Sequence, residues 1–177
     1  MEVFEAIKKR RSIRKFTDKE IPDEILMKIV DAGRWAPSGR NDQPLEVIIV
    51  KDKKKLKRLR EIYDEARHIG KFFEQETSYM EKGVIMIVIA EREKSWRTFS
   101  VAMSCQNMLL AATALGLGSL TIGATHRNKI GMDEIRKTYD IPANMEIEIF
   151  LAFGYPEEEP APTHRKNLKE IVHYEKY

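Results

Sequence analysis

Residues 84–90 form an uninterrupted run of seven apolar residues, and this run constrains the fold of the chain more than any other feature. A strand with one face in water alternates apolar with polar residues, whereas a strand covered on both faces is apolar throughout. We therefore predict a central strand here, with cover on both of its faces. Residues 45–50 and 146–153 predict two further strands.

Apolar residues that recur every three or four positions predict four helices. The first is short and begins near Val3, and the second follows Pro22, a residue favoured at the start of a helix, and ends near residues 33–37. A basic helix is predicted from residue 53 to about residue 68. The fourth helix is predicted from about residue 100 to residue 115, where Gly116 ends it.

The segment 99–125 contains no Asp, Glu, Lys or Arg. Polar residues and glycines interrupt it, so it lacks the roughly 18 consecutive apolar residues that a membrane span requires, and no membrane insertion is expected. A helix that is apolar nearly all round has more surface than one small domain covers. We therefore expect part of this helix to pack against a second copy of the chain, in a homodimer.

The composition suits one domain over residues 1–177, long enough to bury a core without disulfides. Charged residues make up 33% of the chain but the net charge is only +3, which indicates no bulk polyanion as partner. Cys105 is the single cysteine, so no internal disulfide and no cysteine-rich metal site is expected. With no cleavable signal expected before the first helix, we predict a cytoplasmic protein.

A basic cluster, Arg10-Arg11-Ser12-Ile13-Arg14, follows the first predicted helix. Guanidinium groups present forked donors that match phosphate oxygens, and a hydroxyl adds a neutral donor, so the cluster predicts an anion site. Taken alone, it is more often a solvated surface. Two other polar segments, at residues 36–44 and 160–166, strengthen the anion interpretation, because three such segments could share one ligand.

Together these segments resemble the nitroreductase family of FMN-dependent oxidoreductases. The RRS-x-R motif of that family corresponds to residues 10–14, its PS-x-x-N-x-QP loop to residues 37–44, and its GLG-x-x-x-IG turn to residues 116–123. The resemblance implies an α+β fold with a central, mainly antiparallel sheet flanked by helices. It also implies an intertwined homodimer with FMN in the cleft between the protomers.

The resemblance assigns Arg10 and Ser12 to the FMN phosphate, together with Arg165 and, less strongly, Lys166. Arg14 is expected at the pyrimidine edge of the flavin, where a fixed cation favours the negative charge of the reduced ring, so it is the first candidate catalytic residue. Arg11 also belongs to the cofactor-binding motif. Its side chain points away from those of its neighbours, however, and this direction favours plain surface or a contact with the partner chain.

Two backbone segments complete the implied site. Pro37, Ser38, Asn41 and Gln43 match the loop that reaches the flavin from the other subunit, although a polar turn would explain them as well. Ile122 and Gly123 match the position of a backbone N–H near flavin N5, which makes Gly123 the second candidate catalytic residue; a strand that ends in glycine is the alternative. Leu45 and Gly39 depart from the common pattern of the family and leave the pocket shape and the substrate open.

Other kinds of site find little support. Residues 116–119 follow a helix instead of a strand, which excludes a Rossmann site, and the four histidines show no metal-ligand spacing, so no metal is expected. The basic run 51–60 could bind nucleic acid, but acidic residues follow it on the same helix and favour a solvated face. Ordinary packing is the favoured explanation for four aromatic residues in segments that could roof the pocket, Phe72, Phe73, Tyr79 and Trp96.

The implied activity is a ping-pong oxidoreductase reaction, in which NADH or NADPH delivers hydride to FMN and a small electron-poor acceptor, such as a nitroaromatic, a quinone or a flavin, takes the reducing equivalents. A flavin reductase or a reductive dehalogenase of the same family is an alternative. A flavin-binding module without significant turnover is another, and a nucleic-acid-binding protein is a distant third.

Overall fold

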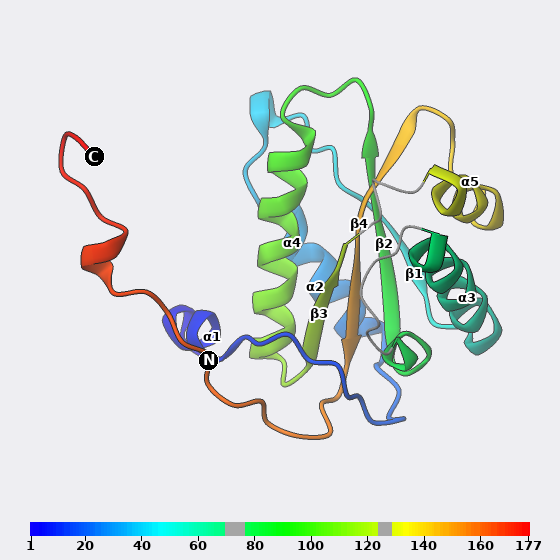
Figure 1. Ribbon diagram of the computed structural model, residues 1–177, viewed down its shortest axis with the longest axis horizontal. Coiled ribbons are helices and arrows are strands. Elements are labelled where there is room, and N and C mark those ends of the chain that lie inside the picture. Colours follow the sequence, from blue (N-terminus) through cyan, green and yellow to red (C-terminus); the bar gives the residue numbers. More distant parts are fainter. Residues whose placement is uncertain (70–76, 124–128) are drawn as a thin grey trace.

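The computed structural model describes residues 1–69, 77–123 and 129–177, with side chains left out at 67–69 and 129–130. In these residues an antiparallel sheet lies between two layers of helices (Figure 1). Its strand order is β1-β2-β4-β3, with β1 at Glu46–Val50, β2 at Val84–Glu91, β3 at Gly118–Ile122 and β4 at Met145–Gly154. The predicted α+β class with a mainly antiparallel sheet is confirmed.

Strand β2 is buried over all but its last residue, as the apolar run 84–90 predicts. Its side chains alternate between two cores. Ile85, Ile87 and Ile89 face the layer of α3 (Lys53–Ile69) and α5 (Lys129–Thr138). Met86 and Val88 face the layer of α2 (Asp23–Arg34) and α4 (Arg97–Ala114). Each face of the central strand is therefore covered by a pair of helices.

The predicted elements agree with the structure to within a few residues, but the sequence analysis missed helix α5, and it considered strand β3 only as an alternative to a turn before Gly123. The short first helix is α1, Val3–Lys9, and the predicted helix 100–115 begins earlier, at Arg97. Helix α5 has no counterpart among the predictions, because it is only ten residues long and contains Gly131, and both features weaken a helical pattern. Three short 3-10 turns complete the described elements, η1 (Gly39–Asn41), η2 (Ser78–Glu81) and η3 (Leu168–Glu170).

Helix α4 is buried on one side only within this chain. Val101, Cys105 and Met108 lie in the core, whereas Phe99 and Met103 are exposed. The exposed side carries no charge from Phe99 to Ala114. No helix in the part of the chain that the structure describes is long and apolar enough to cross a bilayer.

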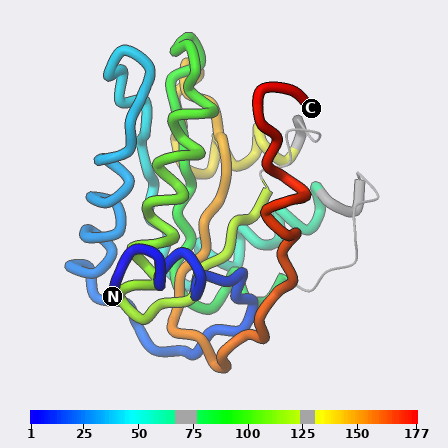
Figure 2. Tube along the Cα trace, turned by 90° about the vertical axis from the view of Figure 1, so that its left-hand side faces the viewer, coloured from blue at the N-terminus to red at the C-terminus, as the bar shows by residue number. Residues whose placement is uncertain are grey.

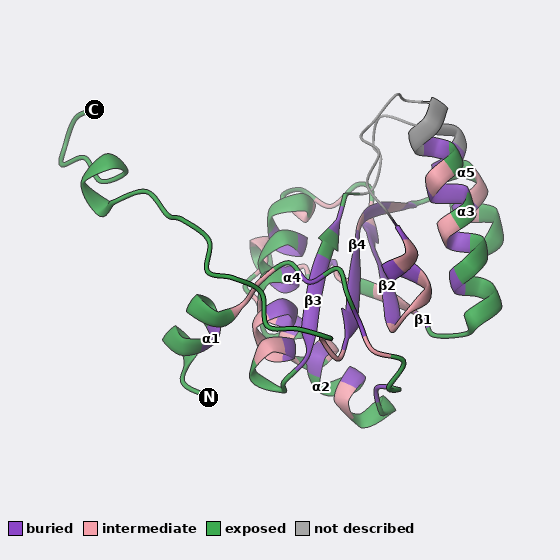
Figure 3. Cartoon of the chain, turned by 60° about the horizontal axis from the view of Figure 1, so that its bottom comes forward, coloured by how far each residue is buried: buried purple, intermediate pink, exposed green. Residues whose placement is uncertain are grey.

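Residues 155–177 leave the lower end of the sheet and extend away from the body in Figure 1, and Figure 2 views this tail from the side toward which it extends. Every residue from Glu157 to Tyr177 is exposed, and Figure 3 shows this tail and α1 in the exposed colour beside the buried strands. The tail nevertheless carries large apolar side chains, among them Leu168, Ile171 and Tyr174. Such side chains are unfavourable in water, so the tail and α4 both carry apolar surface that the described residues of one chain leave uncovered.

Candidate functional site

The basic cluster lies along the free edge of β3. Ser12 forms a parallel bridge with Ser119, and the Ile13 N–H donates to the Ser119 carbonyl at 2.9 Å. Ile13 is buried against Gly118. Because side chains alternate along an extended chain, Arg10, Ser12 and Arg14 share the side opposite to Ile13. The structure therefore brings three of the predicted phosphate-binding and flavin-binding residues onto one face.

Two cations of this face have no acidic partner in the part of the chain that the structure describes. No carboxylate of the described residues pairs with Arg10 or Arg14. Their neighbours do have partners, since Lys9 pairs with Glu5 at 2.8 Å and Lys15 pairs with Glu158 at 3.1 Å. Two unneutralised guanidinium groups beside a hydroxyl form a donor set that suits a phosphate.

Arg11 lies on the other side of the segment, as its alternate direction predicts. Its guanidinium donates to the carbonyl of Lys8 and, at 2.9 Å, to the carbonyl of Arg10. Lys8 lies in the last turn of α1 and Arg10 directly follows the helix, where backbone acceptors lack internal partners, so Arg11 caps that helix. The structure does not bring Arg11 together with Arg10, Ser12 and Arg14.

Strand β3 connects this cationic face to the predicted catalytic glycine. From Ser119 beside Ser12, the strand continues to Ile122, which is buried, and Gly123, which is exposed. Four residues of strand span about 13 Å. Apart from its chain neighbours, no described residue has an atom within 4 Å of the position of a Cβ at Gly123, and a glycine suits close approach of a ligand to the backbone. The edge thus presents cations at one end and open backbone at the other.

The loop from Pro37 to Gln43 is tightly folded. The Gln43 N–H donates to the Ser38 Oγ at 3.0 Å, and the Gln43 side-chain amide donates to the Asn41 carbonyl at 3.4 Å. Arg40, Asn41 and Gln43 have φ angles of 55°, 59° and 44°. Left-handed backbone is uncommon for residues other than glycine, and it clusters at functional sites. The loop has the local strain expected of a binding loop.

This loop and the cationic face lie at opposite ends of α4. Gly39 packs against Trp96, directly before the first residue of the helix. Arg11 and Ile13 line one cavity with Thr113 and Gly116, at the other end. The 18 residues of α4 span about 27 Å, so within one chain the two predicted parts of the site do not meet (Figure 1).

The two basic residues of the tail, Arg165 and Lys166, make no contact with the basic cluster among the bonds that the structure shows. Arg165 donates to the Thr163 hydroxyl at 2.7 Å and to the His164 carbonyl at 2.8 Å, and both bonds are local. Arg165 and Lys166 are exposed. The structure therefore does not join either residue to Arg10 and Ser12.

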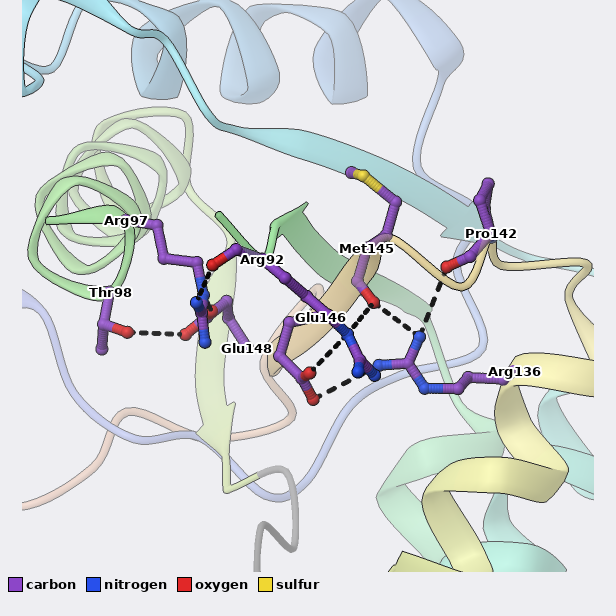
Figure 4. Close-up of polar contacts among 8 residues, drawn as sticks. All are labelled: Arg92, Arg97, Thr98, Arg136, Pro142, Met145, Glu146 and Glu148. Carbon is purple, nitrogen blue, oxygen red and sulfur yellow. Dashed lines mark hydrogen bonds and ion pairs between the residues drawn. The ribbon is translucent and has the colours of Figure 1, made fainter. Parts of the chain in front are cut away.

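A buried carboxylate that the sequence analysis missed holds the start of α4 in place. Glu148 lies on β4 where the pairing with β2 is irregular, between Val88 and Ile89. It accepts from Arg97 at 2.5 Å and from the Thr98 hydroxyl at 3.1 Å, and Figure 4 shows both bonds. Glutamate in the mainly apolar strand segment 146–153 was the available signal, because a buried charge requires a partner.

A second ion-pair group lies next to this one in Figure 4. Glu146 pairs with Arg92 at 3.1 Å and with Arg136 at 3.3 Å. Arg136 also donates to the carbonyl of Met145 at 2.6 Å. The start of α4 and the end of α5 are therefore both tied to β4.

The remaining candidates of the sequence analysis divide into three groups. Tyr79 is buried, as ordinary packing predicts, whereas Trp96 is 69% exposed and contradicts that explanation. Phe72, Phe73 and His126 lie outside the described residues.

Burial, and secondarily Glu148, raises the pKa of the Cys105 thiol to about 12, which suits an unreactive core residue. Within the described residues, no group of three His, Cys, Asp or Glu is arranged to hold a metal ion.

Comparison with known proteins identifies the chain's relatives. The model of the nitroreductase family matches residues 7–155. A protein of Methanothermobacter thermautotrophicus, provisionally named NADH dehydrogenase/NAD(P)H nitroreductase, is 31% identical over 164 residues, which cover 90% of this chain and 80% of that protein. The iodotyrosine deiodinase of Thermotoga neapolitana is 29% identical over 193 residues, covering 97% of each chain.

Solved structures show the same fold. The crystal structure of a nitroreductase with bound FMN from Bacteroides fragilis has a TM-score of 0.83 to this chain at 27% identity. The alignment covers 99% of this chain and all of the other. The similarity therefore extends from α1 through the exposed tail.

Proposed function

Because the chain belongs to the nitroreductase family, we propose that it is an FMN-dependent oxidoreductase that uses NADH or NADPH to reduce an electron-poor organic acceptor. The FMN in the Bacteroides fragilis relative and the name of the Methanothermobacter relative support this proposal. A reducing compartment such as the cytoplasm suits a chain with one cysteine.

The observation that carries the proposal is the cationic face beside β3. Arg10 and Arg14 have no carboxylate partner among the described residues, and Ser12 is exposed between them. The phosphate of FMN is largely dianionic near neutral pH, and each charge-assisted hydrogen bond to it contributes about 1.5 to 3 kcal/mol. We assign the phosphate to Arg10 and Ser12.

Arg14 and Gly123 have the catalytic roles in this proposal. A cation at Arg14 stabilises negative charge that develops on the pyrimidine edge of the flavin, and it therefore favours the reduced state. The backbone at Gly123 is exposed, and no described residue beyond its chain neighbours crowds it, so it suits an N–H donor to flavin N5. Arg11, which caps α1, has a structural role in this scheme.

We further propose that the site is complete only in a homodimer. Pro37, Ser38, Asn41 and Gln43 lie about one length of α4 from the cationic face, so in our scheme they serve the FMN bound to the partner. The uncharged exposed side of α4 and the apolar side chains of the tail supply surface for the second copy. In this scheme the tail also carries Arg165 and Lys166 toward a phosphate.

Bound FMN supplies reversible hydride transfer, first from NAD(P)H and then to the acceptor. For a nitroaromatic acceptor the overall two-electron reaction converts the nitro compound, NAD(P)H and one proton into the nitroso compound, NAD(P)⁺ and water. The protein contributes binding, orientation and a fixed positive field. No side chain is required to form a covalent bond.

Flavin titration followed by stopped-flow absorbance tests the proposal. Purified protein is expected to bind FMN, to lose the flavin colour on mixing with NADH or NADPH without oxygen, and to regain it when a nitroaromatic or quinone is added. Folded protein that does not bind FMN would refute the proposal. Protein that binds FMN but is not reduced by either nucleotide would be a flavin carrier instead of an enzyme.

Reductive dehalogenation is the second candidate, because the similarity to the Thermotoga neapolitana iodotyrosine deiodinase covers 97% of each chain. In that reaction an aryl iodide and NAD(P)H give the arene, NAD(P)⁺ and iodide. Iodide release from 3-iodotyrosine, compared with reduction of a nitroaromatic by the same preparation, decides between the two.

A further inference from the structure

Backbone strain is concentrated beside the first turn of α4. Six residues other than glycine have positive φ in the described part of the chain, and four of them lie here: Arg40, Asn41, Gln43 and Trp96. Trp96 has a φ of 64°, a left-handed conformation that is exceptional for a bulky side chain. Such strain persists only where the surrounding structure enforces it.

The contacts of the two residues after Trp96 hold its backbone in the left-handed conformation. Arg97 and Thr98 both donate to the buried carboxylate of Glu148, and Arg97 also donates to the Arg92 carbonyl (Figure 4). Gly39 packs against Trp96 from the other side. The start of α4 is therefore fixed on β4, and it holds Trp96 in its strained conformation.

Within one chain, this arrangement leaves an aromatic pair exposed beside the loop that carries the cation Arg40. Trp96 is 69% exposed and Phe99 is 66% exposed, with ring centroids 5.6 Å apart and ring planes at 47°. Arg40, next to Gly39 in the loop, is exposed and has no carboxylate partner among the described residues. Aromatic faces stack with planar rings, and a guanidinium group binds carboxylates.

We propose that Trp96, Phe99 and Arg40 bind the electron acceptor, and that this acceptor is a planar aromatic compound with a carboxylate or similar anionic group. The inference rests on the proposed function, since the loop from Pro37 to Gln43 is assigned there to the partner's FMN. The aromatic pair adjoins that loop, so each chain presents an acceptor-binding surface to the flavin of the other.

Two nitro compounds of nearly equal shape test the charge of the acceptor. Steady-state reduction of 4-nitrobenzoate and of neutral 4-nitrobenzamide is measured with the FMN-loaded dimer, and kcat/KM is expected to be higher for the benzoate. Arg40→Asn introduces a residue that tolerates positive φ. It should lower the ratio of kcat/KM for the benzoate to kcat/KM for the benzamide about tenfold, through KM. Lys94→Gln removes a nearby charge that pairs with Glu91 and should leave the ratio unchanged.

The aromatic contribution is tested with Trp96→Gly. Glycine adopts the left-handed backbone without strain, so the variant should unfold at a higher temperature than the original protein, while kcat/KM falls about tenfold for both nitro compounds. The exposed Trp35, changed to Ala, is the matched control and should retain acceptor kinetics. A merely structural Trp96 would instead lower the melting temperature on substitution.

With protein that binds FMN, any of three results would overturn the inference. An unchanged ratio in Arg40→Asn would show that Arg40 does not recognise an anionic group on the acceptor. Unchanged kinetics in Trp96→Gly would show that the aromatic pair does not bind the acceptor. Dissociation of the Trp96→Gly dimer in sedimentation velocity would make Trp96 a subunit contact. FMN binding and reduction by NAD(P)H are measured separately, so their success shows that only the acceptor site has failed, whereas protein without FMN overturns both proposals.

Discussion

At the scale of single residues, the basic cluster shows how neighbouring side chains of one type acquire different functions. Arg10, Arg11 and Arg14 are chemically identical, but the backbone of this segment is extended, and Ile13 is buried against β3. The alternation that follows turns Arg11 toward the carbonyls of α1 and leaves Arg10 and Arg14 without carboxylate partners among the described residues. Local geometry, more than residue type, separates structural from binding arginines.

Substitution of Arg14 should change the redox potential more than the affinity for FMN. Arg14→Ala removes a cation that favours the reduced flavin, so the midpoint potential should become more negative. Arg10→Ala removes a phosphate ligand and should raise the Kd of FMN about 10- to 100-fold, with little change in potential. Equilibration with reference dyes measures the potential, and fluorescence titration measures the Kd.

Lys15→Ala provides the control for this pair, because Lys15 is exposed beside the cluster and pairs with Glu158. Both quantities should match those of the original protein. If Arg14→Ala and Arg10→Ala give the same shifts in potential and affinity, the division of roles between the two arginines is wrong.

At the scale of secondary-structure elements, the position of the cationic segment depends on its packing against the start of β3. A Cβ added at Gly118 would lie 2.9 to 3.0 Å from three atoms of Ile13. Ile13 is β-branched and buried, so it has little freedom to move aside. Gly118 therefore determines how closely residues 10–14 approach the sheet.

Gly118→Ala should displace this segment and weaken FMN binding together with stability. Overpacking of this kind costs about 1 to 3 kcal/mol in the free energy of unfolding, measured by urea denaturation. Adding Ile13→Ala should restore part of the FMN affinity, because it removes the side chain that clashes. Thr121→Ala, at an exposed position of the same strand, is the control. Full FMN affinity in Gly118→Ala would show that the segment does not need this contact.

At the scale of the whole molecule, the two predicted halves of the site are separated by the length of α4. This separation is the main reason to propose a site that two chains share. The three residues of the loop with positive φ lower the stability of the fold, and binding of a ligand by the loop would explain why they are there.

Mixed dimers should distinguish a shared site from a site within one chain. Arg10→Ala and Asn41→Gly chains, each with a different affinity tag, are expressed together and the mixed dimer is isolated. A shared site places both substitutions in one site and leaves the other intact, so the mixed dimer should bind one FMN tightly at a concentration where each parent dimer binds little. If each site is built from a single chain, both sites carry one substitution and no binding is regained.

The stability of the whole fold should fall in alkaline solution. Burial, and secondarily Glu148, raises the pKa of Cys105 from 9.0 to about 12, and burial, then Asp52, raises the pKa of Tyr139 from 10.0 to about 12. The unfolded chain loses these protons first, so the stabilisation is complete below pH 9 and is lost as pH rises toward 12. Urea denaturation between about pH 8 and about pH 10.5 measures the slope. Cys105→Ala and Tyr139→Phe should each make it shallower, and variants with the original slope would contradict these pKa shifts.

The sequence by itself determined the family, the central strand and most of the helices. Three short motifs in order, followed by the basic pair Arg165 and Lys166, identified the family, which the match over residues 7–155 confirms. The apolar run 84–90 predicted a strand covered on both faces. These features are short motifs or periodic patterns, and both can be recognised from the order of residues alone. Helix α5 was not predicted, because its helical pattern is short and contains a glycine.

Only the tertiary structure decided which polar residues meet. The Glu148 carboxylate bonds with residues about 50 positions away in the chain, and the exposure of Trp96 depends on that anchor and on Gly39. The distance between the binding loop and the cationic face likewise depends on how α4 lies across the sheet. Contacts between distant residues follow from packing, and packing is a property of the folded chain that no single segment carries.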